Sequence, residues 1–305
     1  MSSEQWLRTR PAVIRGSFAR SLFEKMMREQ QLRSFDRRKW YTYDKSAVSD
    51  ALQSKFIEMM CDSETNDFIE SCYNKSEWVF THLFQAIART FLCLFMTSTS
   101  VNGLLGRGSM FIFSRQQITT FHEDLLCLKA DPNSTLLDLG AGDGEVTTVL
   151  SNFFNRTFVT EVSPVMRRIL TKKGFKTLDA FSWQNENIDF DLISCLNLLD
   201  RCDKPLTMLK HIRTRLKPNG RLLLALVLPF SQYVESSSNK HKPSEQLPIT
   251  GTCLESQLIS FHDNVIKPYG FELIKWTKLP YLCEGDLELS FYWLNDIVML
   301  LKAVD

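Results

Sequence analysis

The amino-acid sequence predicts an α/β fold with a doubly wound parallel sheet, and three observations support this prediction. From Ser134 onward, short apolar runs alternate with helical stretches, which is the pattern of βαβ units. The first of these runs ends in a glycine-rich loop, residues 138–144, that leads into a helical stretch. Up to about Ala130 the pattern is helical instead, so we expect a helical N-terminal extension in front of the α/β domain.

The α/β domain is expected to contain five strands and a closing pair. Each run is short and apolar and is bounded by turn or helix signals. The expected strands are residues 135–139, 157–162, 175–178, 190–196 and 221–228, followed by the closing pair at 271–276 and 297–301. A helix face with Leu206, Leu209 and Ile212 precedes the fifth strand and is stopped by the Lys-Pro-Asn-Gly of residues 217–220.

Three segments organise the chain. Residues 1–38 form a basic N-terminal extension that is expected to be partly disordered, residues 39–130 form a helical cap or lid, and residues 131–305 form the α/β domain. Within that domain the polar stretch at about 231–252 is too long for an ordinary connection, so we expect a loop that covers a site.

The cap region is expected to contain two helices and a loop. An amphipathic pattern predicts one helix over residues 47–60, and a second helix is expected to begin at residues 76–78. Residues 102–110 are too rich in glycine for a helix interior, which predicts a loop there. The apolar face of the second helix is expected to comprise Val79, Leu83, Ile87, Phe91, Leu94 and Phe95.

Composition describes an ordinary globular protein. The 305 residues are 44% hydrophobic and 23% charged, and a net charge of +1 exerts no strong pull toward nucleic acid. Eight cysteines without a C-x-x-C pair indicate reduced thiols in an intracellular, mainly cytoplasmic protein, with a mitochondrial or ER location as the alternative. The scattered histidines predict no metal site, and no apolar run is long enough to predict membrane insertion.

The glycine-rich loop predicts a cofactor site. Glycine allows a tight turn and close approach of backbone to a ligand, as expected for Gly140 and Gly142. Glu161, about twenty residues further on, can accept both hydroxyls of a ribose. A dinucleotide site prefers G-x-G-x-x-G, whereas this loop has G-x-G-x-G with carboxylates around it, among them Asp138. Such carboxylates suit a sulfonium and an ammonium group, so the sequence favours S-adenosyl-L-methionine over NAD.

The loop after the fourth strand predicts the catalytic residues. Chemistry in a doubly wound sheet takes place beyond the carboxyl ends of the strands, where this chain has Asn197 and Asp200. Two polar groups separated by two leucines can hold a planar substrate, and Asp200 can accept an N–H on one side of a ring. The alternative is that Asp200 caps the following helix, but Asp203 is the better cap by position.

Two further residues are weaker candidates. Arg107 can reach the carboxylate of the cofactor through a charge-assisted pair, although a solvated loop arginine is nearly as good an interpretation. Tyr292 can offer a hydroxyl or a stacking face to an aromatic substrate, although a core tyrosine is a serious rival.

Several motifs together resemble the DREV family of methyltransferase-like proteins, which are protein-histidine N-pros-methyltransferases with a class I Rossmann-like fold. The resemblance covers roughly residues 40–302. The motifs that carry it are residues 104–110 (LLGRGSM), 138–147, 195–203, 226–230 (LVLPF) and 279–286 (LPYLCEGD).

The resemblance implies transfer of a methyl group from S-adenosylmethionine to the pros nitrogen of histidine in His-x-His segments of proteins, where x is small. It assigns Asn197, Asp200 and Tyr292 to the target imidazole, and Asp138, Gly140 and Glu161 to the cofactor. This chain departs from the vertebrate forms in having Phe-Tyr at residues 291–292 in place of two tyrosines, and in lacking an apolar N-terminus. It contains no His-x-His, so automethylation is not expected.

Other functions are compatible with the same fold. A small-molecule or RNA N-methyltransferase can use an identical cofactor site, because a fold does not fix a function. A non-catalytic cofactor-binding partner is a third possibility, and the intact Asp138, Gly140, Gly142 and Glu161 argue against it. The sequence leaves the oligomeric state undetermined.

Overall fold

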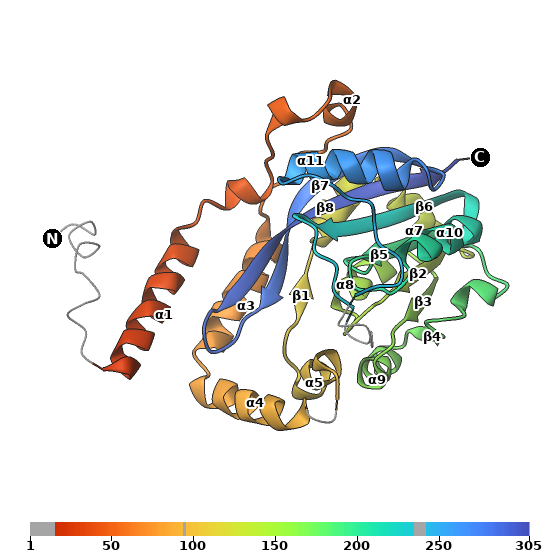
Figure 1. Cartoon of the computed structure of the whole chain (residues 1–305). Helices are drawn as coiled ribbons and strands as arrows, with labels where there is room; N and C mark the ends of the chain where they lie inside the picture. Colours follow the sequence, from red (N-terminus) through yellow and green to blue (C-terminus); the bar gives the residue numbers. More distant parts are fainter. Residues whose placement is uncertain (1–15, 94–95, 235–241, 305) are drawn as a thin grey trace.

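The computed structural model describes residues 16–93, 96–234 and 242–304. A twisted sheet of eight strands forms the middle layer, and helices cover both of its faces (Figure 1). The strands run in the order β1-β7-β8-β6-β5-β2-β3-β4. Their bounds are β1 Met110–Phe111, β2 Thr135–Leu139, β3 Arg156–Thr160, β4 Lys176–Leu178, β5 Phe190–Leu196, β6 Leu216–Val227, β7 Phe271–Glu284 and β8 Phe291–Ala303.

The sheet has a parallel half and an antiparallel half. Strands β6, β5, β2, β3 and β4 are mutually parallel, while β8 pairs antiparallel with β6, β7 with β8, and β1 with β7. Because the chain winds from β2 outward through β3 to β4 and then returns to β5, the strand order reverses between β2 and β5. A reversal of this kind leaves a crevice at the carboxyl ends of the strands, where ligands bind. The doubly wound prediction is confirmed.

Helices α8, α9 and α10 form the crossovers between parallel strands, α11 precedes β7, and the other helices lie in the N-terminal region. The bounds are α1 Ser17–Ser34, α2 Asp50–Gln53, α3 Ser63–Ser76, α4 Val79–Leu92, α5 Ser98–Leu105, α6 Arg115–Phe121, α7 Leu125–Ala130, α8 Glu145–Ser151, α9 Pro164–Lys172, α10 Pro205–Arg215 and α11 Leu254–Phe261. Shorter 3₁₀ turns are η3 Arg37–Trp40, η4 Lys45–Ala47 and η5 Trp183–Asn185, and η6 His262–Ile266 is a π-helical turn.

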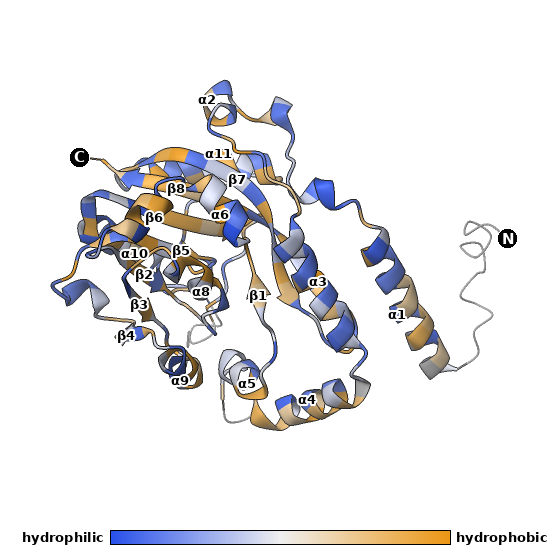
Figure 2. Ribbon diagram, turned by 180° about the vertical axis from the view of Figure 1, so that it is seen from behind, coloured by the Kyte–Doolittle hydropathy of each residue, from blue (hydrophilic) through white to orange (hydrophobic). Residues whose placement is uncertain are grey.

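Two apolar cores lie on the two faces of the sheet. One face is covered by α10 and α11, whose Leu209, Ile212 and Phe261 are buried against the strands. The other face is covered by α3, α6, α7 and α8, with Ile69 and Leu150 among the buried side chains. The strands are apolar on both sides for this reason, which Figure 2 shows as orange ribbons through the sheet.

Strand pairing extends the antiparallel half beyond the apolar runs. β2 and β5 have the predicted bounds, because both lie between neighbouring strands in the middle of the sheet and their sequences are mainly apolar. The last two strands were expected over 271–276 and 297–301, but β7 and β8 continue as a long hairpin. Backbone hydrogen bonding to a neighbouring strand maintains a strand through polar residues that hydropathy alone assigns to a loop.

The second helix expected in the cap region is observed as α4, which begins at Val79, whereas the predictions for residues 47–60 and 102–110 are wrong. The helix expected over residues 47–60 is limited to α2, and Phe56 instead forms a β-bridge with Trp276. Residues 76–78 contain the end of α3, and α4 begins without a side-chain cap. The chain through Asn102–Leu105 is helical, because α5 continues to a left-handed cap at Gly106. Leu94 and Phe95 of the predicted apolar face lie outside the described residues.

Gly103 explains how a helix tolerates glycine there. A Cβ atom at this position would lie 2.8 Å from the sulfur of Met166 on α9, so the missing side chain lets α5 approach α9 closely. A buried hydrogen bond of 2.8 Å joins Ser100 of α5 to Ser163 at the start of α9. Close packing against the α/β domain therefore decides the conformation that local propensity disfavours.

The segment between α1 and α3 is hydrogen-bonded along β7. The backbone N–H of Ile57 donates to the carbonyl of Trp276 at 2.8 Å, and the N–H of Trp276 donates to the carbonyl of Lys55 at 2.9 Å. The indole N–H of Trp276 donates to the carbonyl of Leu52 at 2.7 Å, in full burial. The cap region is thus part of the same packed unit as the sheet, with β1 as its edge strand.

We expect Trp276→Phe to lower the free energy of unfolding by about 1–2 kcal/mol, because the buried Leu52 carbonyl loses its donor while a ring still packs against Phe56. Urea unfolding measures this change. Trp78→Phe is the matched control, because Trp78 is 60% exposed and its replacement should leave the midpoint unchanged. Equal losses in the two variants would contradict the role given to the Trp276 hydrogen bond.

Candidate active site

The glycine-rich loop connects β2 to α8 at the reversal of strand order. Gly140 and Gly142 both adopt left-handed backbone angles, with φ of 70° and 56°. A Cβ atom at Gly140 would come within 2.8 Å of the Leu198 side chain, so this turn is packed against the loop after β5. A Cβ atom at Gly142 would meet nothing within 4 Å, and the backbone there borders open space. The loop therefore offers a bare backbone surface to a ligand.

Glu161 follows β3 directly and holds the loop in place. Its carboxylate accepts the N–H of Gly142 at 3.0 Å with one oxygen and the N–H of Ser163 at 2.8 Å with the other. The side chain is buried, with 7% of its surface exposed. An ionised carboxylate has about four acceptor positions, so two remain for the hydroxyls of a ribose. This arrangement fits the cofactor predicted from the sequence.

Two other carboxylates at the loop, those of Asp138 and Glu145, form contacts within the protein. Asp138 lies beneath the loop, where it accepts hydrogen bonds from Thr147 and, at 2.6 Å, from Ser194. Burial raises the pKa of Asp138 to about 6. Glu145 forms an ion pair with Lys173 at 2.7 Å. The carboxylate that contacts the open loop is that of Glu161, and Asp138 joins β2, α8 and β5 from below.

The loop after β5 presents Asn197 in an unusual conformation. Among the described residues, Asn197 is the one non-glycine residue with positive φ, at 52°. Its amide Nδ2 donates to Oδ2 of Asp296 at 2.8 Å, and its backbone N–H donates to the carbonyl of Ala225 at 3.0 Å. Left-handed backbone in asparagine persists where surrounding contacts fix it, as these two do.

Asp200 and Asp296 complete a buried polar cluster with Asn197. In the described part of the chain, one oxygen of each of the three side chains is buried without a hydrogen-bond partner. Burial raises the pKa of Asp200 to about 6 and that of Asp296 to about 8, the latter also through the nearby charge of Asp200. Asp296 is therefore neutral at pH 7, and Asp200 is mostly ionised. The unpartnered oxygens of Asn197 and Asp200 are buried acceptors, which favour an incoming N–H donor.

Asp296 is a residue that the sequence analysis missed. It lies on β8, is fully buried, and has apolar neighbours on its C-terminal side at residues 297–301. The available signal was an acidic residue at the edge of an otherwise apolar strand, which is costly unless the carboxyl is neutral or hydrogen-bonded. Its distance in the chain from Asn197 concealed the partnership.

The polar loop at about residues 231–252 contacts the loop after β5. The N–H of Tyr233 donates to the carbonyl of Asp200 at 2.8 Å. Asp203 does not cap α10 as expected, because its carboxylate accepts the backbone N–H and the hydroxyl of Ser244, each at 2.8 Å. Glu245 instead accepts the N–H of Thr207 in the first turn of α10 at 2.8 Å. Both described ends of the polar loop thus contact the candidate catalytic loop.

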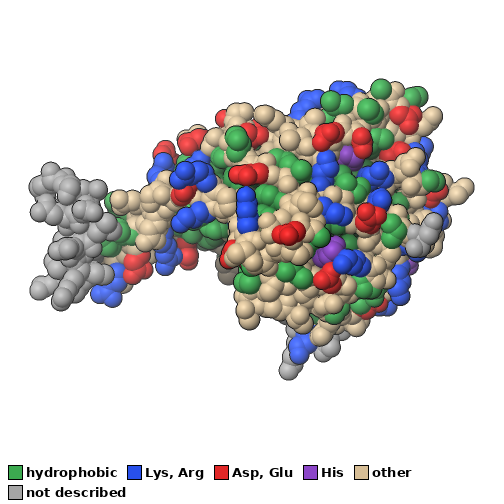
Figure 3. Space-filling view, turned by 90° about the horizontal axis from the view of Figure 1, so that it is seen from above, with side chains coloured by type: hydrophobic (Ala, Val, Ile, Leu, Met, Phe, Trp, Pro, Cys, Tyr) green, Lys and Arg blue, Asp and Glu red, His purple; other side chains and the backbone are tan. Residues whose placement is uncertain are grey.

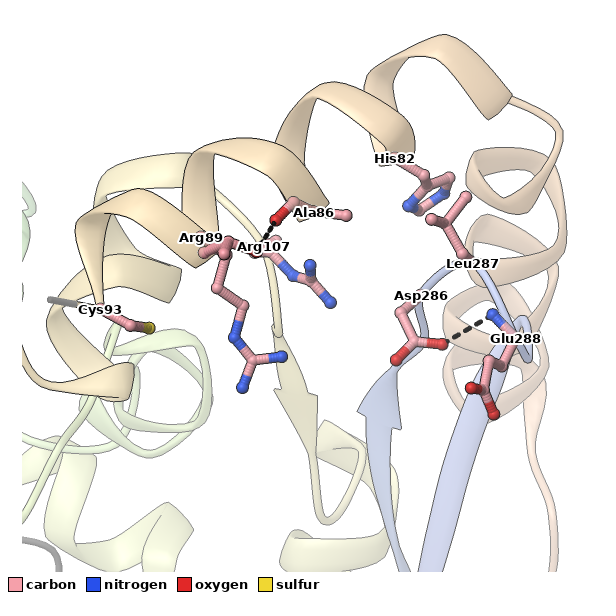
Figure 4. A pocket seen from close by; sticks show the side chains of 9 residues that line it. His82, Ala86, Arg89, Cys93, Arg107, Asp286, Leu287 and Glu288 are labelled. Carbon is pink, nitrogen blue, oxygen red and sulfur yellow. Dashed lines mark hydrogen bonds between the residues drawn. The ribbon is translucent and has the colours of Figure 1, made fainter.

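Arg107 lines a cleft of about 420 Å³ between α4 and the β7–β8 hairpin, and Tyr292 contacts one of its lining residues. The Tyr292 hydroxyl donates to Asp286 at 2.9 Å, and this aspartate lines the cleft. Figure 4 shows Arg89 and Arg107 on the helical side and Asp286 and Glu288 on the hairpin side. The structure thus brings Asn197 and Asp200 together, while the hydrogen bond of Tyr292 belongs to the hairpin.

The cleft has oppositely charged walls. Arg89 and Arg107 provide the cationic wall, and neither forms an ion pair in the described structure. Asp286 and Glu288 form the acidic wall. Among the described residues, no group of three or more His, Cys, Asp or Glu side chains is arranged to hold a metal ion.

Known structures share parts of this architecture. Precorrin-6y C5,15-methyltransferase from Geobacter metallireducens is 17% identical, with a TM-score of 0.38, over 62% of this chain and 89% of that one. The N-methyltransferase NodS from Bradyrhizobium japonicum, solved with S-adenosyl-L-homocysteine, is 14% identical, with a TM-score of 0.39, over 62% and 87%. A TehB-like methyltransferase from Corynebacterium glutamicum is 17% identical, with a TM-score of 0.37, over 62% and 94%.

The strand order, the closing antiparallel pair and the loop held by Glu161 define a class I methyltransferase that uses S-adenosylmethionine. The model of the DREV methyltransferase family matches residues 40–303, and the chain belongs to that family.

We expect Gly142→Arg to abolish binding of S-adenosylhomocysteine, because the new side chain fills the open space that the loop borders. Gly174→Arg is the matched control: Gly174 also has positive φ and open space, so the backbone strain is comparable, about 1–2 kcal/mol. Isothermal titration calorimetry should detect binding in the control alone. Unchanged affinity in folded Gly142→Arg would show that the cofactor lies elsewhere.

We expect Asp296→Asn to flatten the pH dependence of stability. Folding raises the pKa of Asp296 from 3.8 to about 8, so the folded chain retains a proton that the unfolded chain releases. The wild type therefore loses stability as pH rises from about 4 to about 8, at up to about 1.4 kcal/mol per pH unit. The asparagine still accepts the Asn197 hydrogen bond but does not titrate.

Urea unfolding at several pH values compares the two proteins. Asp296→Ala is the control, because it removes the acceptor as well as the titration and should lower stability at every pH. Parallel curves for wild type and Asp296→Asn would contradict a neutral, buried Asp296.

Proposed function

We propose that this methyltransferase modifies the pros nitrogen of histidine in His-x-His segments of proteins, with x a small residue. The observation that carries the proposal is the unpartnered, buried oxygen of Asp200 beside Asn197. The site lies at the carboxyl end of β5, and Leu198 in the same loop contacts the cofactor turn at Gly140. A substrate group hydrogen-bonded to Asp200 is thus adjacent to the cofactor.

The chemistry of a neutral imidazole fits this environment. One ring nitrogen carries a proton and the other a lone pair. If ionised Asp200 accepts a hydrogen bond from the N–H of the tele nitrogen, the lone pair resides on the pros nitrogen, and Asn197 Oδ1 or Nδ2 can orient the ring. When bound, S-adenosylmethionine supplies an electrophilic methyl group. Asp200 can then take up the proton that the methylated ring releases, and catalysis is largely alignment.

The open cleft between α4 and the β7–β8 hairpin fits a peptide substrate. In an extended peptide, side chains two residues apart point the same way, so two imidazoles project from one side. One can meet Asp200, and the other can occupy the cleft beside Tyr292, where Asp286 and Glu288 offer acceptors. A large residue between them would collide with the groove wall. In this proposal Arg107 either contacts the substrate in the cleft or pairs with the carboxylate of the cofactor.

The alternatives predict different surfaces. An RNA substrate requires a continuous basic area, whereas the cleft combines Arg89 and Arg107 with Asp286 and Glu288. The face seen from above in Figure 3 also has cationic and acidic side chains interspersed. A small metabolite favours a closed pocket, whereas the described cleft is bounded by two separate elements, α4 and the hairpin. A non-catalytic partner has no use for the unpartnered oxygen of Asp200. We place the protein inside the cell, chiefly in the cytoplasm, where its protein substrates reside.

We expect methylation of a His-Ala-His peptide, at the pros nitrogen, and little methylation of a His-Trp-His peptide.

Asp200→Ala should lower turnover about a hundredfold while affinity for S-adenosylhomocysteine remains. The rate should fall as pH drops below about 6.5, because the imidazole and then Asp200, with a pKa of about 6, become protonated. Fragment-ion mass spectrometry locates the methyl group, and calorimetry measures affinity.

Asp263→Ala is the control variant, because Asp263 is an exposed carboxylate on η6. Equal methylation of the two peptides, or a methyl group on the tele nitrogen, would contradict the substrate assignment and restore the small-molecule alternative. Loss of cofactor affinity in Asp200→Ala would contradict the role of Asp200 instead.

A further inference from the structure

Helix α4 has its polar side toward the protein and its apolar side toward solvent. Five large apolar side chains recur at i, i+3, i+4, i+7 and i+11, which places them on one face of a helix. All five are exposed: Phe80, Leu83, Phe84, Ile87 and Phe91, with 86%, 66% and 63% of the surface accessible for the three phenylalanines. Figure 2 shows this helix as a largely orange ribbon at the lower edge of the molecule.

The inward face of α4 is fixed by polar contacts. His82 is buried, and its Nε2 lies 2.9 Å from the carbonyl of Lys75. Gln85 donates to the carbonyl of Leu105 at 3.3 Å, and Arg89 donates to the hydroxyl of Ser98 at 3.2 Å. Rotating the helix to bury its phenylalanines would break these contacts. The exposed apolar face is therefore an outcome of how α4 is attached at both of its ends.

We propose that the outer face of α4, residues Phe80, Leu83, Phe84, Ile87 and Phe91, docks the enzyme on the surface of a lipid bilayer. The helix has 14 residues and no acidic side chain, and Trp78 precedes it with 60% of its surface exposed. A short helix with aromatic and aliphatic residues on one face lies in the interface between headgroups and acyl chains. None of the helices in the described part of the chain is long and apolar enough to span a membrane.

The position of a second helix, α1, favours a flat partner such as a bilayer over a groove that binds α4 alone. The first turn of α1 lies near the level of α4 in Figures 1 and 2, and the rest of α1 rises at the side of the molecule. The first ten residues of α1 expose Leu22 and Met26 and carry Arg20 and Lys25 against a single acid, Glu24. A bilayer can contact two separate helices at one edge, whereas a groove that binds one helix covers α4 alone. Cations at this edge are attracted to anionic headgroups.

Docking through α4 would place the cleft next to the membrane. The opposite side of the same helix contributes His82, Ala86 and Arg89 to the cleft wall. Arg107, from the loop after α5, faces the same space (Figure 4). Substrate segments close to a lipid surface would therefore reach the cleft with little searching. The docking itself does not depend on which group the enzyme methylates.

Vesicle co-sedimentation of the full chain tests the proposal. The probes are vesicles of phosphatidylcholine alone and of phosphatidylcholine mixed with phosphatidylserine. We expect the wild type to sediment with both and more strongly with the anionic mixture, and Phe80→Glu/Phe84→Glu to partition at least about tenfold less. Phe181→Glu is the matched control, because Phe181 is 81% exposed but lies in the loop after β4. It should sediment like the wild type.

Three outcomes would overturn the proposal. The wild type remains in the supernatant with both vesicles, or Phe181→Glu and the double variant lose sedimentation equally. The third is a concentration-dependent dimer, seen by light scattering, that the double variant converts to monomer while vesicle binding is absent; the face would then join two copies of this chain. Phe91→Ser, at the other end of the face, is a second variant, and unchanged thermal midpoints show that all variants are folded.

Discussion

The hydrogen bond between Asn197 and Asp296 joins the two halves of the sheet at the candidate active site. Asn197 follows the parallel strand β5, whereas Asp296 lies on the antiparallel strand β8, with β6 between them. The bond holds Asn197 in a left-handed backbone that a side chain rarely adopts. It also leaves one oxygen of each residue buried and free to meet a ligand. The geometry of the catalytic loop therefore depends on where the closing hairpin lies.

The cofactor side of the site is formed mainly by backbone, and the substrate side is formed by buried side chains. On the cofactor side, glycine backbone and Glu161 form a surface whose shape is fixed by local turns and one carboxylate. On the substrate side, side chains from the loop after β5 and from β8 converge, and burial alters the pKa of both acids. Asp138 connects the two sides, because it accepts hydrogen bonds from α8 and from β5. A shift of α8 or of β5 would therefore change the geometry of both the cofactor side and the substrate side.

Helix α4 has two faces that serve different surroundings. Its polar side completes a charged cleft with the β7–β8 hairpin, and its apolar side is left outward. Burying apolar surface normally decides how a helix is oriented. Here the ends of the helix are held by α3 and α5, through His82 and Gln85, and these attachments decide instead. The same attachments fix the positions of Arg89 and Arg107 in the cleft.

The sequence by itself determined the strands of the parallel half, the glycine loop and the place of Glu161. These features depend on residues close together in the chain, where apolar periodicity and turn chemistry act directly. Only the tertiary structure decided the length of the β7–β8 hairpin, the helical state of Asn102–Leu105 and the partnership of Asn197 with Asp296. It also decided that the apolar face of α4 points outward. Pairing between strands, close packing at Gly103 and burial of a carboxyl all join residues distant in sequence, and no local pattern encodes them.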